Sequence, residues 1–107
     1  MSVRSTIEGG RLVLHTEAIE AALTPTSSVI LLNTPWNPAG TVFREDELRA
    51  ISDLVVRRNL VLISDEIYEA ITYAGARHIS PASLSPAMRE RTVVVNSLSK
   101  TYAMTGW

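Results

Sequence analysis

Three short aliphatic runs constrain the fold of this chain more than any other feature. None of them alternates apolar with polar residues, and they span residues 29–32, 60–63 and 92–95. Runs of this kind are typical of strands covered on both faces, as in a parallel sheet between two layers of helices. We therefore expect three neighbouring parallel strands, at residues 29–33, 60–64 and 92–96.

The segment between the first two runs predicts a helix over residues 44–58. Acidic residues fill its first turn and two arginines its last, which are the charges that a helix dipole favours at those ends. The expected outer side carries Asp53, Arg57 and Arg58. Apolar residues recur at helical spacing on the inner side, at Leu48, Ile51, Leu54 and Val55.

Two shorter helices complete the pattern. One over about 17–23 has Thr16 as its expected cap, and another over about 86–91 has Ser85 as cap and Pro86 at its first position. Crossover connections between parallel strands are right-handed, so the three strands lie side by side. The chain therefore predicts a three-layer α/β unit with parallel strands.

Composition bounds the class of protein. The 107 residues are enough for one domain, and a net charge of -1 without any basic block makes nucleic acid an unexpected partner. The absence of cysteine excludes disulfides and thiolate chemistry. No apolar run is long enough for a signal peptide or a membrane span, so we expect a cytoplasmic protein. His15 and His78 have no second ligand at metal spacing in the sequence, so we interpret both as solvated histidines and expect no metal.

Polar residues follow each of the three runs. Ligands of parallel sheets bind beyond the carboxyl ends of the strands, so these residues are candidates for a site. Asn37 follows the first run, Asp65 and Tyr68 follow the second, and Lys100 follows the third, behind two serines. If the strands are neighbours, an amide, a carboxylate, a phenol and an amine converge at one edge of the sheet.

This set of groups is complementary to pyridoxal 5′-phosphate. A lysine can form a Schiff base with its aldehyde, a carboxylate can keep its ring nitrogen protonated, and phenol or amide donors can bond its ring oxygen. Simpler interpretations exist for each group taken alone. Asn37 is also a common turn residue, Asp65 and Glu66 could cap a helix, and a lysine is usually a solvated charge.

Three motifs in order resemble the class I/II aminotransferases of fold type I. They are Asn-x-Pro-x-Asn-Pro-x-Gly at 33–40, Asp-Glu-x-Tyr at 65–68, and Ser-x-Ser-Lys at 97–100 followed by Met-x-Gly-Trp. The resemblance extends from about residue 7 to residue 107. It implies the large, cofactor-binding domain of such an enzyme, with a homodimeric parent protein.

The resemblance implies a role for each site residue. Lys100 would be the Schiff-base lysine and proton shuttle, and Asp65 the partner of the ring nitrogen. Tyr68 and Asn37 would bond the ring oxygen, while the two serines, Ser97 and Ser99, would contact the phosphate. The implied reaction transfers an amino group between an amino acid and a 2-oxo acid.

Departures from the family pattern keep other interpretations open. The family's arginine after Gly-Trp, its earlier phosphate-binding helix terminus and its substrate-binding arginine have no counterpart in residues 1–107. We therefore interpret the chain as a partial large domain with both ends missing, and we expect little catalysis from it alone. The alternatives are another fold type I enzyme, such as a lyase or decarboxylase, a cofactor-sensing regulatory domain, and an inert fragment. The resemblance also implies a cis Asn37–Pro38 bond.

Overall fold

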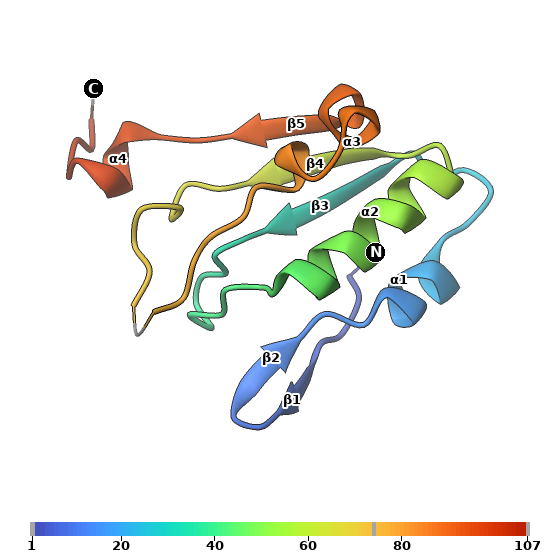
Figure 1. Ribbon diagram of the computed structural model, residues 1–107, viewed down its shortest axis with the longest axis horizontal. Helices are drawn as coiled ribbons and strands as arrows, with labels where there is room; N and C mark the ends of the chain where they lie inside the picture. The colour runs from blue at the N-terminus through green and yellow to red at the C-terminus, as the bar shows by residue number, and fades with distance from the viewer. Residues whose placement is uncertain (1, 74, 107) are drawn as a thin grey trace.

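The computed structural model describes residues 2–73 and 75–106, in which short strands and helices alternate (Figure 1). In chain order the elements are β1 (Thr6–Glu8), β2 (Arg11–Val13), α1 (Thr16–Ala22), β3 (Val29–Asn33), α2 (Glu45–Arg57), β4 (Val61–Asp65), the 3₁₀ helix η1 (Pro81–Ser83), α3 (Pro86–Arg91), β5 (Thr92–Val95) and α4 (Leu98–Thr101). No helix in these two stretches is long and apolar enough to cross a membrane.

The three predicted strands form one parallel sheet in the order β3-β4-β5. Val29 of β3 pairs with Val61 of β4, and Leu62 of β4 pairs with Thr92 of β5. The predicted adjacency and direction are confirmed, with bounds within one residue of those expected. All three carboxyl ends therefore lie at one edge of the sheet, which we call the carboxyl edge.

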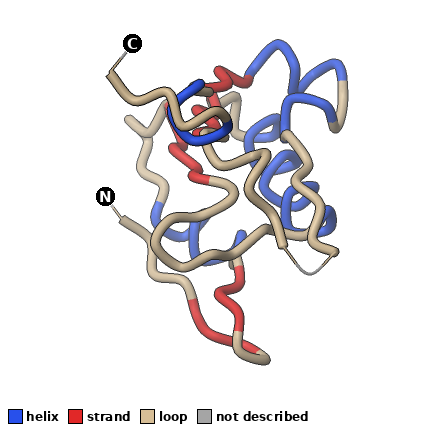
Figure 2. The backbone as a smooth tube through the Cα atoms, turned by 90° about the vertical axis from the view of Figure 1, so that its left-hand side faces the viewer, coloured by secondary structure: helices blue, strands red, loops and turns tan. Residues whose placement is uncertain are grey.

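Helices α2 and α3 pack together on one face of this sheet, as Figure 2 shows from the side of the strand ends. The apolar inner side of α2, which was predicted from the sequence, supplies much of the core. Buried apolar residues come from β3, β4, α1, α2, α3 and the connections between them: Ile19, Ile30, Leu32, Phe43, Leu48, Ile51, Leu54, Val55, Leu60, Leu62 and Met88. The parallel α/β arrangement is thus present as a sheet with one helical layer.

The opposite face of the sheet, which we call the open face, is exposed within the described residues. Leu31 is 71% exposed, and Val29, Val61, Val93 and Val95 are exposed around it. The second helical layer that we expect is not among the described residues, which cover only one face of the sheet. The non-alternating runs have the composition of doubly covered strands, but only one helical layer is present among the described residues.

The N-terminus of α2 is fixed by the buried carboxylate of Glu47. It accepts hydrogen bonds of 2.9 Å from the main-chain N–H groups of Arg44 and Leu14, and it forms an ion pair of 2.5 Å with Arg11. Burial acts to raise the pKa of Glu47, but these donors outweigh it and hold the pKa below its ordinary value. The same residue thus caps α2 and ties β2 to it.

Two details of the secondary structure differ from the expectations. Thr16 is the first helical residue of α1 and His15 occupies the cap position, so the predicted cap is displaced by one residue. Strands β1 and β2 form an antiparallel hairpin that was not predicted, although Gly9-Gly10 between them is a turn signal. The cap of α3 is as predicted, because the Ser85 hydroxyl accepts a hydrogen bond from the Met88 N–H.

Candidate functional site

The loop after β3 carries Asn37, which is exposed at the carboxyl edge. Its main-chain N–H donates a hydrogen bond of 2.9 Å to Oδ1 of Asn33, the last residue of β3. The Asn37–Pro38 bond is cis, as predicted, and so is Thr34–Pro35. The loop closes where Gly40 donates to the Trp36 carbonyl at 2.7 Å, with Gly40 at a φ of 65° that glycine adopts without strain.

Asp65 ends β4 and lies half-buried beside this loop. Its main-chain carbonyl accepts a hydrogen bond of 2.9 Å from the Thr34 N–H and one of 3.2 Å from the Asn33 side chain. Its carboxylate accepts a long hydrogen bond of 3.4 Å from the Ile67 N–H. Strand alternation places the Asp65 side chain on the open face, which is the face that also carries Leu31.

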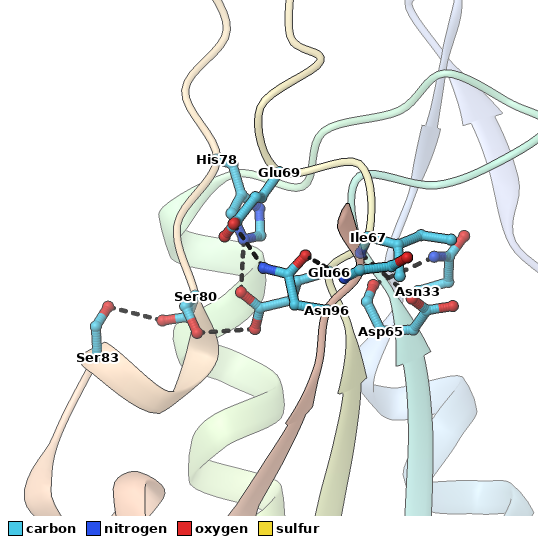
Figure 3. A network of polar contacts seen from close by, with 10 residues as sticks. Asn33, Asp65, Glu66, Ile67, Glu69, His78, Ser80, Ser83 and Asn96 are labelled. Atoms are coloured by element: carbon cyan, nitrogen blue, oxygen red, sulfur yellow. Dashed lines mark hydrogen bonds and ion pairs between the residues drawn. The ribbon is translucent and has the colours of Figure 1, made fainter. Parts of the chain in front are cut away.

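Glu66 points to the other side of the sheet and is 1% exposed. One carboxylate oxygen accepts a hydrogen bond of 2.8 Å from Ser80, and the other lies 2.8 Å from Nε2 of His78 (Figure 3). Burial acts to raise the pKa of Glu66, but the bonds from His78 and Ser80 outweigh it and lower the pKa. The interpretation of His78 as a solvated residue is therefore wrong, because its side chain is 9% exposed and paired.

Tyr68 and Lys100 meet at the carboxyl edge from different strands. Tyr68 is half-buried on the turn after β4, and the Lys100 Nζ lies 5.7 Å from the centroid of its ring. At this distance an ammonium group is attracted to the ring face. The two segments are also joined by Asn96, whose side-chain amide donates a hydrogen bond of 2.5 Å to Glu69 (Figure 3).

Ser97 and Ser99 bond to the chain's own backbone. The Ser97 hydroxyl accepts a hydrogen bond of 3.0 Å from the Ser99 N–H and so caps α4, which carries Lys100. The Ser99 hydroxyl donates to the Met104 carbonyl at 3.4 Å. The phosphate-binding role of both serines stays a prediction.

The fold brings Glu66, Glu69 and His78 together, although the sequence spacing did not indicate it. One potential ligand atom of each lies within 4.8 Å of the others. Both carboxylate oxygens of Glu66 already take part in contacts, with Ser80 and His78, and one oxygen of Glu69 accepts a hydrogen bond from Asn96. Sequence alternation offers one signal for this group: it places Glu66 on the covered face, where a carboxylate needs partners.

The candidate site residues at the carboxyl edge are each half-buried or exposed. A groove of about 760 Å³ lies elsewhere, along the outer edge of β3, where it is lined by residues 2–5, by α1 and by both faces of β3. It reaches the carboxyl edge only at Asn33 and Trp36. The candidate site is thus defined by the residues that follow the three strand ends, and not by this groove.

Fold and site together define a parallel α/β domain with its polar groups gathered beyond the strand ends, which is where such sheets bind small molecules. Residues 11–107 match the family described as "Aminotransferase class I and II". The chain belongs to this family.

Known proteins of the family are similar to the chain in sequence and in structure. An aspartate aminotransferase of Geobacillus stearothermophilus is 38% identical over 101 residues, which cover 94% of this chain and 26% of that protein. The structure of N-succinyldiaminopimelate aminotransferase from Mycobacterium tuberculosis is 37% identical with a TM-score of 0.92, covering 96% of this chain and 27% of the other.

A third similar structure is that of a PLP-bound putative aminotransferase from Clostridium difficile 630. It is 30% identical with a TM-score of 0.85, and the match covers 94% of this chain and 26% of the other. The fold type I aminotransferase resemblance is therefore confirmed. The chain spans about a quarter of the length of the relatives that it matches.

Proposed function

We propose that the full-length protein containing this chain is a pyridoxal-phosphate-dependent aminotransferase that transfers an amino group between an amino acid and a 2-oxo acid. The observation that carries this proposal is the approach of the Lys100 amine to Tyr68, at the edge of the sheet that also carries Asp65 and Asn37. Membership of the aminotransferase family supports it.

The donor set at the carboxyl edge fits pyridoxal phosphate. The cofactor offers an aldehyde, a basic ring nitrogen, a ring oxygen and a phosphate, and the edge offers an amine, a carboxylate, a phenol and hydroxyls. Lys100 is the only lysine in the 107 residues, so it is the only side-chain amine of the chain that could bind the aldehyde. Asp65 keeps one carboxylate oxygen free of hydrogen bonds from the described residues.

Each residue then has a defined task. Lys100 would hold the aldehyde carbon and, once released, move a proton to and from the substrate's α-carbon. Asp65 would hold a proton on the ring nitrogen, while Tyr68 and Asn37 would donate to the ring oxygen, and Ser97 and Ser99 would bind the phosphate. The bound cofactor supplies an electron sink for the pair of electrons left on the α-carbon.

The test uses the full-length protein. Added pyridoxal phosphate is expected to give a new absorbance band, and borohydride reduction followed by peptide mass spectrometry is expected to find the cofactor on Lys100. A panel of amino acids with 2-oxoglutarate then identifies the amino donor. Label on another lysine would overturn the assignment of Lys100, and no 2-oxo acid product from any donor would overturn the aminotransferase proposal.

The remaining parts of the proposal rest on the resemblance. We propose that residues 1–107 are part of the large cofactor-binding domain, that the full-length protein is a homodimer and that it acts in the cytoplasm. Light scattering coupled to size-exclusion chromatography tests the dimer, with a monomer mass as the contrary result. Cell fractionation tests the location, and recovery with the membrane fraction would contradict it.

A further inference from the structure

Glu66 lies between two residues of the candidate site in the sequence, but its own side chain points away from that site. Asp65 precedes it on the open face and Tyr68 follows two residues later, whereas the Glu66 carboxylate is buried on the covered face. A buried carboxylate is stable only where hydrogen bonds or charges compensate its loss of water. His78 and Ser80 supply that compensation, one to each oxygen, both at 2.8 Å.

The main chain of Glu66 is held as firmly as its side chain. Its N–H donates a hydrogen bond of 2.8 Å to the Val95 carbonyl, which extends the pairing of β4 with β5 by one residue. Its carbonyl accepts a hydrogen bond of 2.9 Å from the Glu69 N–H, which forms the turn that carries Tyr68. One residue thus joins the end of β4, the Tyr68 turn and the loop before η1.

We propose that Glu66 is a positioning residue for Asp65 and Tyr68. This inference rests on the proposed function, because it assigns Glu66 the task of aiming two side chains at the cofactor. Its anchored carboxylate fixes the direction in which the chain leaves β4, and that direction sets where the phenol stands relative to the Lys100 amine. His78 and Ser80 act through Glu66, from a loop twelve and fourteen residues further along the chain.

The chain offers a matched control for a purely structural role. Glu47 is also a buried carboxylate with a lowered pKa and several hydrogen-bond donors, but it ties α2 to Arg11 and Leu14 instead of to the site. Substitution of either glutamate by leucine leaves buried donors without an acceptor, so both variants are expected to unfold at a lower temperature. Only the Glu66 variant is expected to change the site.

The experiment compares Glu66→Leu, Glu66→Gln and Glu47→Leu in the full-length protein. Two readouts need no turnover: amide hydrogen exchange of residues 66–71 without cofactor, and the pH midpoint of the absorbance change of bound pyridoxal phosphate. Glu66→Leu is expected to speed the exchange, shift the midpoint and lower kcat by roughly 10- to 100-fold, as displacements of about 1 Å can. Glu66→Gln can still form hydrogen bonds with Ser80 and His78, so its exchange rate, pH midpoint and kcat are expected to stay close to those of the natural protein.

The contrary results are distinct. If Glu66→Leu matches Glu47→Leu in exchange, midpoint and kcat, and differs from the natural protein only in melting temperature, Glu66 is structural and the inference is wrong. If Glu66→Leu does not fold, Ser80→Ala carries the same test, because it removes one anchor and leaves the carboxylate in place. A natural protein without cofactor binding overturns the proposed function instead, while the exchange experiment still reports whether Glu66 orders the segment.

Discussion

The side-chain amide of Asn33 donates a hydrogen bond of 3.2 Å to the main-chain carbonyl of Asp65. The oxygen of the same carboxamide accepts the N–H of Asn37 at 2.9 Å. One side chain at the end of β3 therefore connects the loop that carries Asn37 with the strand end that carries Asp65. Two of the proposed cofactor-binding residues thus depend on a third residue for their relative position.

Substitution of Asn33 separates these two connections. Asn33→Ala removes both bonds, whereas Asn33→Asp keeps an acceptor for Asn37 and replaces the donor to Asp65 by a negative charge. We expect each variant to lose about 1 kcal/mol or more of stability. Amide hydrogen exchange at Asn37 should increase in Asn33→Ala and stay near the natural rate in Asn33→Asp; equal exchange in both variants would show that the Oδ1 bond does not hold the loop.

The sheet and its site edge were predictable because they depend on local patterns and a topological rule. Apolar runs indicate strands, and right-handed crossovers order them, so the polar residues that follow the runs must share one edge. The cap of α3 was predictable for the same reason, since Ser85 and Pro86 form a local signal. These inferences need no knowledge of distant contacts.

The anchoring of the site was not predictable from local patterns. Glu66 and His78 lie twelve positions apart in the sequence, with no helix or strand among the described residues between them, so no periodicity indicates where the histidine returns to the sheet. The hairpin of β1 and β2 escaped prediction because each strand has three residues, too few to show a pattern. The exposure of Leu31 was unpredictable because the apolar run is typical of a strand that is covered on both faces in a complete domain, whereas the described residues supply one helical layer.

The buried carboxylate of Glu47 predicts a dependence of stability on pH. Its pKa in the folded protein lies below the ordinary value of 4.5, so the unfolded chain binds the proton more tightly. The stabilisation is therefore complete above the ordinary pKa and is lost as the pH falls through the lowered one. We expect the melting temperature of the full-length protein to decrease as the pH is lowered through this interval. Glu47→Gln is expected to melt at a lower temperature at neutral pH, and its melting temperature is expected to depend less on pH.

Glu45→Gln is the control for this experiment. Glu45 lies in the same turn of α2, but it is exposed and pairs only with Arg49 at the surface among the described residues. Exposed pairs within a helix contribute little to stability. The melting temperature of Glu45→Gln should depend on pH as that of the natural protein does. If Glu47→Gln also shows this natural dependence, other carboxylates, such as Glu66, dominate the acid transition.

The open face predicts that the isolated 107-residue chain associates with itself. Contiguous apolar surface of this kind drives association, and the outer edges of β3 and β5 are unpaired within the described residues. We expect light scattering to show species larger than a monomer, and Leu31→Lys to reduce them. Ile7→Lys is the matched control, because Ile7 is 74% exposed but belongs to the two-stranded hairpin and not to the parallel sheet. Equal effects of both variants would place the association elsewhere.

Asp65→Asn tests the chemistry proposed for the carboxylate in the full-length protein. Asparagine keeps the size of the side chain but cannot hold a proton on the ring nitrogen by charge, so the ring becomes a weaker electron sink. We expect Asp65→Asn to bind pyridoxal phosphate with a changed absorbance spectrum and to lose amino-group transfer by several orders of magnitude in kcat. Asp53→Asn, on the exposed side of α2, is the control and should be indistinguishable from the natural protein. Near-natural single-turnover conversion of the cofactor by Asp65→Asn would show that another group holds the ring nitrogen.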